Sequence, residues 1–109
     1  MAYDEGLAQR LREIFADSYD IDEREMFGGI AFMLHGHMCC GIVKDTLMAR
    51  VGPEQYATAL QSQHAREMDF TGKTMKGFVY VDPIGFESDD DLRSWVALCE
   101  RFVNSLPPK

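Results

Sequence analysis

The chain has 109 residues, of which 46% are hydrophobic and 27% charged, a composition typical of one globular domain and not of a disordered chain. Eighteen acidic residues against eleven basic ones give a formal net charge of -7, so direct nucleic-acid binding would need a local basic patch working against the overall field. No stretch has the length of an apolar membrane span, and the charged segment 1–12 lacks the apolar core of a signal peptide. We therefore expect a cytoplasmic protein with no membrane partner.

The first predicted element is an amphipathic helix from about Asp4 to Ser18. Its apolar residues recur at helical spacing, and charged residues occupy the rest of its surface. These apolar residues are Leu7, Leu11, Ile14 and Phe15. The polar segment Asp17–Arg24 that overlaps its end is predicted to be a loop.

The segment from Glu25 to Val51 predicts an antiparallel meander, because short apolar runs alternate with turns of about two residues. The predicted strands are Ile30–Leu34, Met38–Val43 and Leu47–Val51, with turns at His35-Gly36 and Lys44-Asp45. Met33, Met38 and Met48 fall in these strands, and we expect them in the core.

A second, short helix is predicted to open at Gly52-Pro53-Glu54 and to end near Ser62. Proline is tolerated at the first helical position, and a glutamate there favours the positive end of the helix. A turn at Thr71-Gly72-Lys73 then separates the short segment Met68–Phe70 from a strand over Gly77–Val81.

The last predicted element is a helix that begins after Ser88 and ends before Pro107-Pro108. Ser88 and Asp91 have the spacing of a capping box, and a long apolar stripe that includes Trp95 and Cys99 follows them. The whole order predicts one domain over residues 1–109, of the α+β class, with a mainly antiparallel sheet and helices packed on one side in two layers.

The three cysteines have no spacing typical of a disulfide framework and are expected to be reduced. On a regular strand the neighbours Cys39 and Cys40 would project to opposite faces, which hinders pairing between them. The adjacent glycines Gly28 and Gly29 stand directly before a strand, where glycine usually marks a bend or a close approach of two backbones.

Several motifs together resemble the N-terminal domain of the TfoX/Sxy family. They are Met26-Phe27-Gly28-Gly29, Gly36, Cys40-Gly41, Leu47–Val51, Met75–Tyr80 and Trp95. The resemblance implies a regulatory role, since family members include regulators of natural competence that act with transcription machinery to switch on DNA-uptake genes. Those regulators carry a second, helical C-terminal domain that this chain is expected to lack. The family supplies no catalytic residues to transfer.

The candidates for a metal site are His35, His37 and Cys39, because histidine and cysteine bind transition metals and alternate residues of a strand share a face. They lack the spaced ligand pairs of a zinc site, so no metal is predicted and a polar hairpin tip is favoured. A nucleophilic Cys39 or Cys40 would need a base or a cation beside it. Nothing in the spacing requires one, so no catalytic residue is predicted.

A candidate ligand site for an anion consists of Arg50 and Lys76, with the backbone N–H groups of Gly28 and Gly29. Arg66 and Lys73 are further cations that could line the same cleft. The competing interpretation is that these cations are salt-bridged or extend to solvent.

Two functions follow from these patterns. The first is a non-enzymatic, TfoX-like regulatory domain that binds a protein partner or a second copy of itself through a sheet edge or an apolar sheet face. The alternative is a small-molecule (anion) binding or small enzymatic domain that uses the Arg50/Lys76 site. A pocket in which cations, a histidine and a cysteine converge would support the alternative. No cofactor is expected for either.

Overall fold

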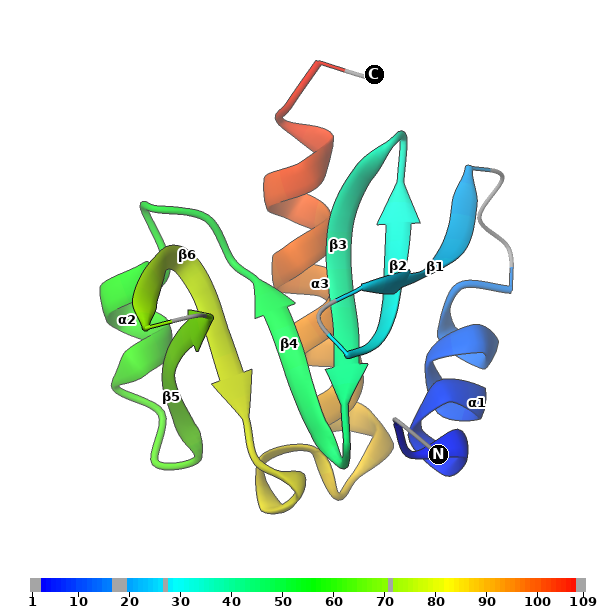
Figure 1. The fold of residues 1–109 in the computed structure, drawn as a ribbon, viewed down its shortest axis with the longest axis horizontal. Helices are drawn as coiled ribbons and strands as arrows, with labels where there is room; N and C mark the ends of the chain where they lie inside the picture. Colours follow the sequence, from blue (N-terminus) through cyan, green and yellow to red (C-terminus); the bar gives the residue numbers. More distant parts are fainter. Residues whose placement is uncertain (1–2, 17–19, 27, 71, 108–109) are drawn as a thin grey trace.

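The computed structural model describes residues 3–16, 20–26, 28–70 and 72–107. Within these ranges six antiparallel strands form one open sheet in the order β1-β2-β3-β4-β6-β5, and three α-helices pack on one face of it (Figure 1). The helices are α1 (Glu5–Ile14), α2 (Tyr56–Leu60) and α3 (Asp89–Asn104), with a 3-10 helix, η1 (Pro83–Phe86), before α3. The strands are β1 (Ile21–Met26), β2 (Gly29–Leu34), β3 (His37–Val43), β4 (Thr46–Arg50), β5 (Ala65–Phe70) and β6 (Lys73–Val81). This arrangement confirms the predicted α+β class.

The first helix, α1, is shorter than predicted. The side chain of Asp4 caps it by accepting hydrogen bonds from two backbone N–H groups of the first turn. The helix ends at Ile14 because Phe15 leaves the helical backbone conformation, and the Phe15 ring stacks on Phe32 of β2 with the ring centroids 5.7 Å apart. The predicted end at Ser18 lies outside the described residues.

The largest error of the sequence prediction concerns β1, which was expected to be part of a loop over Asp17–Arg24. The strand pairs with β2 along its whole length, from Ile21 opposite Leu34 to Met26 opposite Gly29. It lies at the edge of the sheet, and its four central residues are charged and exposed. Charge on an edge strand deters pairing with other chains and removes the apolar alternation by which strands are predicted.

The three predicted strands of the meander are confirmed as β2, β3 and β4, but β3 carries a bulge. Phe32 pairs with Cys40 and Met33 pairs with Met38, so Cys39 has no partner on β2. The extra residue interrupts the alternation of side chains between the two faces of the sheet. Both Cys39 and Cys40 therefore belong to the core under the helices. The expectation that the two cysteines face opposite sides of the sheet is therefore wrong.

The second helix, α2, starts three residues later than predicted, at Tyr56. Pro53–Gln55 form a turn, and no side chain caps the helix. The strand predicted over Gly77–Val81 is confirmed as the second half of a longer β6. The third helix, α3, is capped as predicted, because the Ser88 hydroxyl accepts a hydrogen bond from the Asp91 N–H at 3.0 Å. Within the described ranges no helix is long and apolar enough to cross a membrane.

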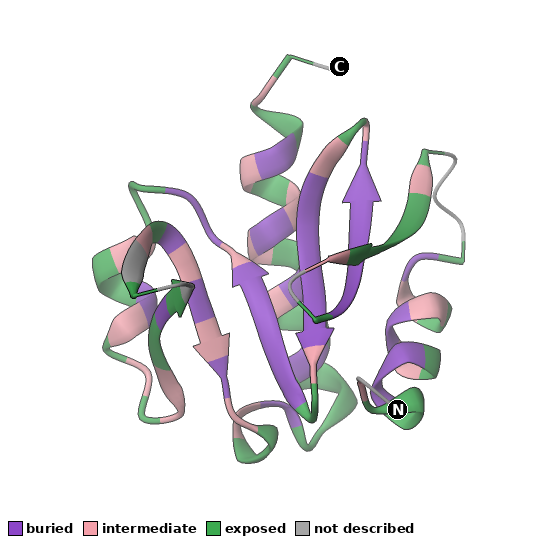
Figure 2. Ribbon diagram, in the orientation of Figure 1, coloured by how far each residue is buried: buried purple, intermediate pink, exposed green. Residues whose placement is uncertain are grey.

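The two faces of the sheet are both apolar. One face packs under the helices, where the large, fully buried residues include Leu47, Val79 and Val96. The central strands β2, β3 and β4 are buried along nearly all of their length (Figure 2). The opposite face holds a second cluster around Met33, Met38, Met48 and Met68, which are at most 7% exposed. Within the described ranges no helix contributes to this cluster, and in Figure 1 β1 crosses in front of β2 on this side. The prediction that Met33, Met38 and Met48 are core residues is confirmed.

Candidate functional site

The three candidate metal ligands, His35, His37 and Cys39, do not converge on one site. His35 Nδ1 lies 3.0 Å from the carboxylate of Asp20, and His37 Nε2 lies 2.7 Å from the backbone carbonyl oxygen of Pro107. Cys39 is fully buried under the helices. In the part of the chain that the structure describes, no group of three or more histidine, cysteine or acidic side chains is placed to hold a metal ion.

The adjacent glycines Gly28 and Gly29, which we call the glycine corner, stand where a side chain would be strained or would clash. Gly28 has a φ of +76°, in the left-handed region that favours glycine, and Gly29 begins β2 beside the end of β3. A Cβ on Gly29 would lie 1.8 Å from the carbonyl oxygen of Ile42 and 3.0 Å from the Cα of Val43. The interpretation of a bend with close backbone approach is therefore confirmed.

Arg50 occupies the place where β3 and β4 separate. Beyond the pair Cys40–Ala49 the two strands no longer pair, and the guanidinium of Arg50 donates a hydrogen bond to the carbonyl oxygen of Met38 at 3.3 Å. The guanidinium carbon lies 5.4 Å from the ring centroids of both Phe78 and Phe102. Burial lowers the pKa of Arg50, and among the described residues no carboxylate forms an ion pair with it.

The structure does not bring the four residues of the predicted anion site together. Gly29 touches the end of β3 at Val43, whereas Arg50 is bonded to Met38 near its start, five residues or roughly 15 Å away. Lys76 is exposed and lies two residues before Phe78, the residue opposite Arg50 on β6. Only Arg50 and Lys76 therefore lie at the same end of the sheet.

The two further candidate cations, Arg66 and Lys73, give no support to an anion site beside Arg50 and Lys76. Arg66 stacks on Tyr80 with its guanidinium carbon 4.7 Å from the ring centroid, and it forms a 3.1 Å ion pair with Asp82. The side chain of Lys73 is outside what the structure describes.

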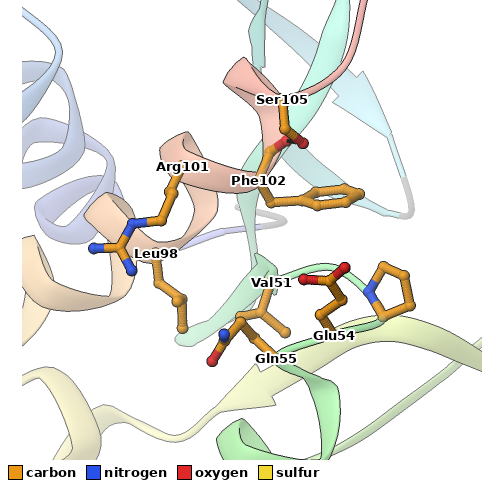
Figure 3. A pocket seen from close by; sticks show the side chains of 8 residues that line it. Val51, Glu54, Gln55, Leu98, Arg101, Phe102 and Ser105 are labelled. Atoms are coloured by element: carbon orange, nitrogen blue, oxygen red, sulfur yellow. Dashed lines mark hydrogen bonds between the residues drawn. The ribbon is translucent and has the colours of Figure 1, made fainter.

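A pocket of about 290 Å³ opens between the segment that follows β4 and the C-terminal half of α3. Its floor is apolar and consists of Val51, Leu98 and the ring of Phe102 (Figure 3). The Phe102 ring lies directly on the backbone of Gly52, where an added Cβ would be 2.3 Å from the ring. We call this pocket the α3 groove.

Polar side chains stand on the two walls of the α3 groove. Glu54 and Gln55 rise from the turn before α2, while Arg101 and Ser105 rise from α3 (Figure 3). Among the described residues neither Glu54 nor Arg101 forms an ion pair, and the Ser105 hydroxyl donates to the carbonyl of Phe102 at 2.5 Å. The groove can therefore take an apolar group on its floor and opposite charges at its two walls.

Sequence reasoning did not find the α3 groove. The one available signal was the width of the apolar stripe on the last helix, since Leu98 and Phe102 extend it beyond the fully buried row of Val96, Cys99 and Val103. When the apolar stripe of a helix is wider than the part that packs on the sheet, the remaining apolar surface is left for contact with another segment or partner.

Comparison with known proteins gives one match. A family model, the TfoX N-terminal domain, matches residues 13–103. No curated protein and no solved structure matches the chain.

Proposed function

Since the chain belongs to the TfoX N-terminal domain family, we propose that it is a cytoplasmic, non-enzymatic regulatory domain that binds a protein partner of the transcription machinery. A link to competence regulation is part of this proposal. The α3 groove is the observation that carries it, because an apolar floor with a polar rim is the form of a protein-interaction site.

The charges of the α3 groove indicate the partner's chemistry. Glu54 on one wall and Arg101 on the other are exposed and face the groove from different elements. A helix that places an apolar side chain on Leu98 and Phe102, with a basic residue toward Glu54 and an acidic one toward Arg101, would complement all of these groups.

The same residues give little support to catalysis at the groove. Of the residues that the structure describes, no histidine or cysteine lines the groove, and the hydroxyl of Ser105 is already hydrogen-bonded to a backbone carbonyl. Glu54 therefore lacks a nucleophile beside it for acyl or phosphoryl transfer.

A second copy of the chain is the less favoured partner. The exposed edge of β1 carries Asp22, Glu23, Arg24 and Glu25, and charged residues on an edge strand oppose edge-to-edge pairing. Light scattering of the purified protein at increasing concentration tests self-association directly.

The proposed function is tested by a charge placed in the α3 groove. Leu98→Asp puts a carboxylate on the apolar floor, and Ala97→Asp puts the same charge on the exposed side of α3 as a matched control. A strain that lacks the protein should show altered transcript levels for a defined set of genes. We expect wild-type protein and Ala97→Asp to restore those levels and Leu98→Asp to fail, with both variants folded by circular dichroism.

Unchanged transcript levels in the deletion strain would contradict a regulatory role. Full restoration by a folded Leu98→Asp would contradict the use of the α3 groove.

The anion-binding alternative has one observation in its favour. Among the described residues the guanidinium of Arg50 donates one hydrogen bond, to a carbonyl, and is held by two aromatic rings, so other donors of this group remain for an anion, with Lys76 at the same end of the sheet. A rise in melting temperature with phosphate or nucleotides that Lys76→Ala removes would favour this second function. Equal melting temperatures with and without anions would count against it.

A further inference from the structure

Two arginines adjoin Phe102, the residue whose ring forms part of the floor of the α3 groove. Arg101 stands on the wall of the groove (Figure 3). Arg50 does not line the groove, but its guanidinium carbon lies 5.4 Å from the centroid of the Phe102 ring. Phe102 therefore belongs both to the floor of the groove and to the surroundings of Arg50.

Lys76 brings a third cation to the same place. It is exposed and precedes Gly77 in β6. A Cβ on Gly77 would lie 3.4 Å from the carbonyl carbon of Gly52 and 3.5 Å from the nitrogen of Pro53, a residue that lines the groove. The α3 groove and the end of the sheet that holds Arg50 and Lys76 are therefore continuous.

The charges of this surface differ from those of the whole chain, which has a net charge of -7. Within the described ranges no ion pair engages Arg50, Lys76 or Arg101. Of the acidic side chains that the structure describes, Glu54 alone lines the groove. An acidic protein thus presents three such cations and one carboxylate here, which favours an occupant that carries negative charge.

The spacing fits a helix as the occupant. Residues three or four apart on one face of a helix have Cβ atoms about 5 to 6 Å apart, and Arg50 lies 5.4 Å from the Phe102 ring. A helix with an apolar side chain on Phe102 therefore places a residue one turn away within reach of Arg50. Among the described residues that guanidinium donates one hydrogen bond, to the Met38 carbonyl, so N–H donors remain for a carboxylate.

We propose that the partner segment in the α3 groove is an acidic amphipathic helix, whose apolar anchor occupies the groove floor and whose carboxylates pair with the three cations. This inference rests on the proposed function and deepens it, since it assigns the partner's charge and extends the contact surface to β4 and β6. The anion beside Arg50 and Lys76 is then a carboxylate of the partner. A single-stranded nucleic acid offers the same charge but no aliphatic side chain for the floor.

Three helical peptides that differ only in charge test the proposal. Each carries one leucine anchor, and the residues three and four positions on either side of it are all glutamate, all lysine or all glutamine. Titration of isotope-labelled protein is followed by NMR at the backbone N–H of Gly52 and the side-chain Nε–H of Arg50. We expect the glutamate peptide to shift both signals and to bind about tenfold more tightly than the glutamine peptide. The lysine peptide should bind more weakly than either.

Matched variants separate specific pairing from general electrostatics. Arg50 and Arg66 are both strand arginines stacked on an aromatic ring of β6, at 5.4 and 4.7 Å from the ring centroids, but Arg66 is already paired with Asp82. Arg50→Gln should lower the affinity for the glutamate peptide about threefold and leave that for the glutamine peptide unchanged, while Arg66→Gln should change neither. Lys76→Gln, at an exposed residue, should act as Arg50→Gln does and keeps the test valid if Arg50→Gln does not fold.

The outcomes distinguish this inference from the proposed function. Equal affinities for the three peptides, or an equal effect of Lys76→Gln and Arg66→Gln, would overturn the acidic partner and leave the groove in use. No shift at Gly52 with any peptide at millimolar concentration, or binding of the glutamine peptide that survives Leu98→Asp in folded protein, would contradict the groove itself.

A thymidine oligonucleotide is the last probe. Because it has no aliphatic anchor, we expect it to bind at least tenfold more weakly than the glutamate peptide. Tight binding that Lys76→Gln weakens and Leu98→Asp does not would assign the surface to a nucleic acid and overturn the proposal.

Discussion

At the residue scale, Arg12 joins the first helix to the edge of the sheet. Its guanidinium makes two parallel hydrogen bonds of 2.8 Å to the Glu23 carboxylate in β1. The hydrogen bond with Glu23 raises the pKa of Arg12, and the same bond lowers the pKa of Glu23 below its ordinary 4.5. Both side chains remain about one third exposed, so solvent screens the pair.

We predict that Glu23→Gln lowers the free energy of unfolding by roughly 0.5 to 1 kcal/mol at neutral pH. Because the pKa of Glu23 is lower in the folded state, its contribution is fully present above pH 4.5 and is lost as the pH falls through the folded-state value. Urea unfolding of both proteins from pH 7 to pH 3 checks this. A difference that stays constant over that range would show that the ion pair is not its source.

The two adjacent glycines should respond very differently to substitution. In Gly29→Ala the new Cβ would meet the carbonyl oxygen of Ile42, so β2 and β3 must separate, and we expect a loss of about 3 kcal/mol or more. In Gly28→Ala the Cβ has open space, and only the positive φ has to be maintained, at a cost of about 1 kcal/mol. Equal losses in denaturant unfolding would contradict the close approach at Gly29.

The surroundings of single residues were the least predictable part of the chain. The sequence marked Arg50 as a cation in a strand, but the rings that enclose it come from β6 and α3, far along the chain. The burial of both Cys39 and Cys40 under the helices depends on a bulge that no local sequence pattern indicates. Such contacts are decided by packing between distant segments, whereas the glycine corner could be predicted because its steric demand is local.

At the scale of elements, apolar strands and capped helices could be predicted and the charged edge could not. The strands of the meander and the helix cap at Ser88 could be predicted because each is specified by a pattern only a few residues long. β1 forms because β2 supplies a complete ladder of partners, and its own residues would suit a loop equally well. The start of α2 at Tyr56 shows the same limit, since a proline is compatible with a turn as well as with a first helical turn.

The methionine face of the sheet is predicted to be a true second core. Met48 is 0% exposed, and it belongs to the cluster to which none of the described helices contributes a residue. Met48→Ala should therefore lower the free energy of unfolding by about 2 to 4 kcal/mol, as much as Leu47→Ala does on the helix-covered face. Chemical denaturation of both variants provides the comparison. A loss below about 1 kcal/mol for Met48→Ala alone would mean that this face is loosely packed.

At the scale of the whole molecule, the charge distribution favours a protein partner over a nucleic acid. The net charge is -7, and several arginines are already paired with acidic side chains. These arginines are Arg10, Arg12, Arg66 and Arg93. A duplex would have to approach against the overall field with those cations engaged. The α3 groove, with an apolar floor and one charge on each wall, meets no such obstacle.

The measurement that tests the central claim most directly is photo-crosslinking from the α3 groove in living cells. A photoreactive amino acid at Gln55, on the rim, is compared with the same residue at Ala97, exposed on α3 outside the groove. We predict a crosslink from Gln55 to one component of the transcription machinery, absent from Ala97 and abolished by Leu98→Asp. Equal crosslinks from both positions, or a Gln55 crosslink that survives Leu98→Asp in folded protein, would contradict the account.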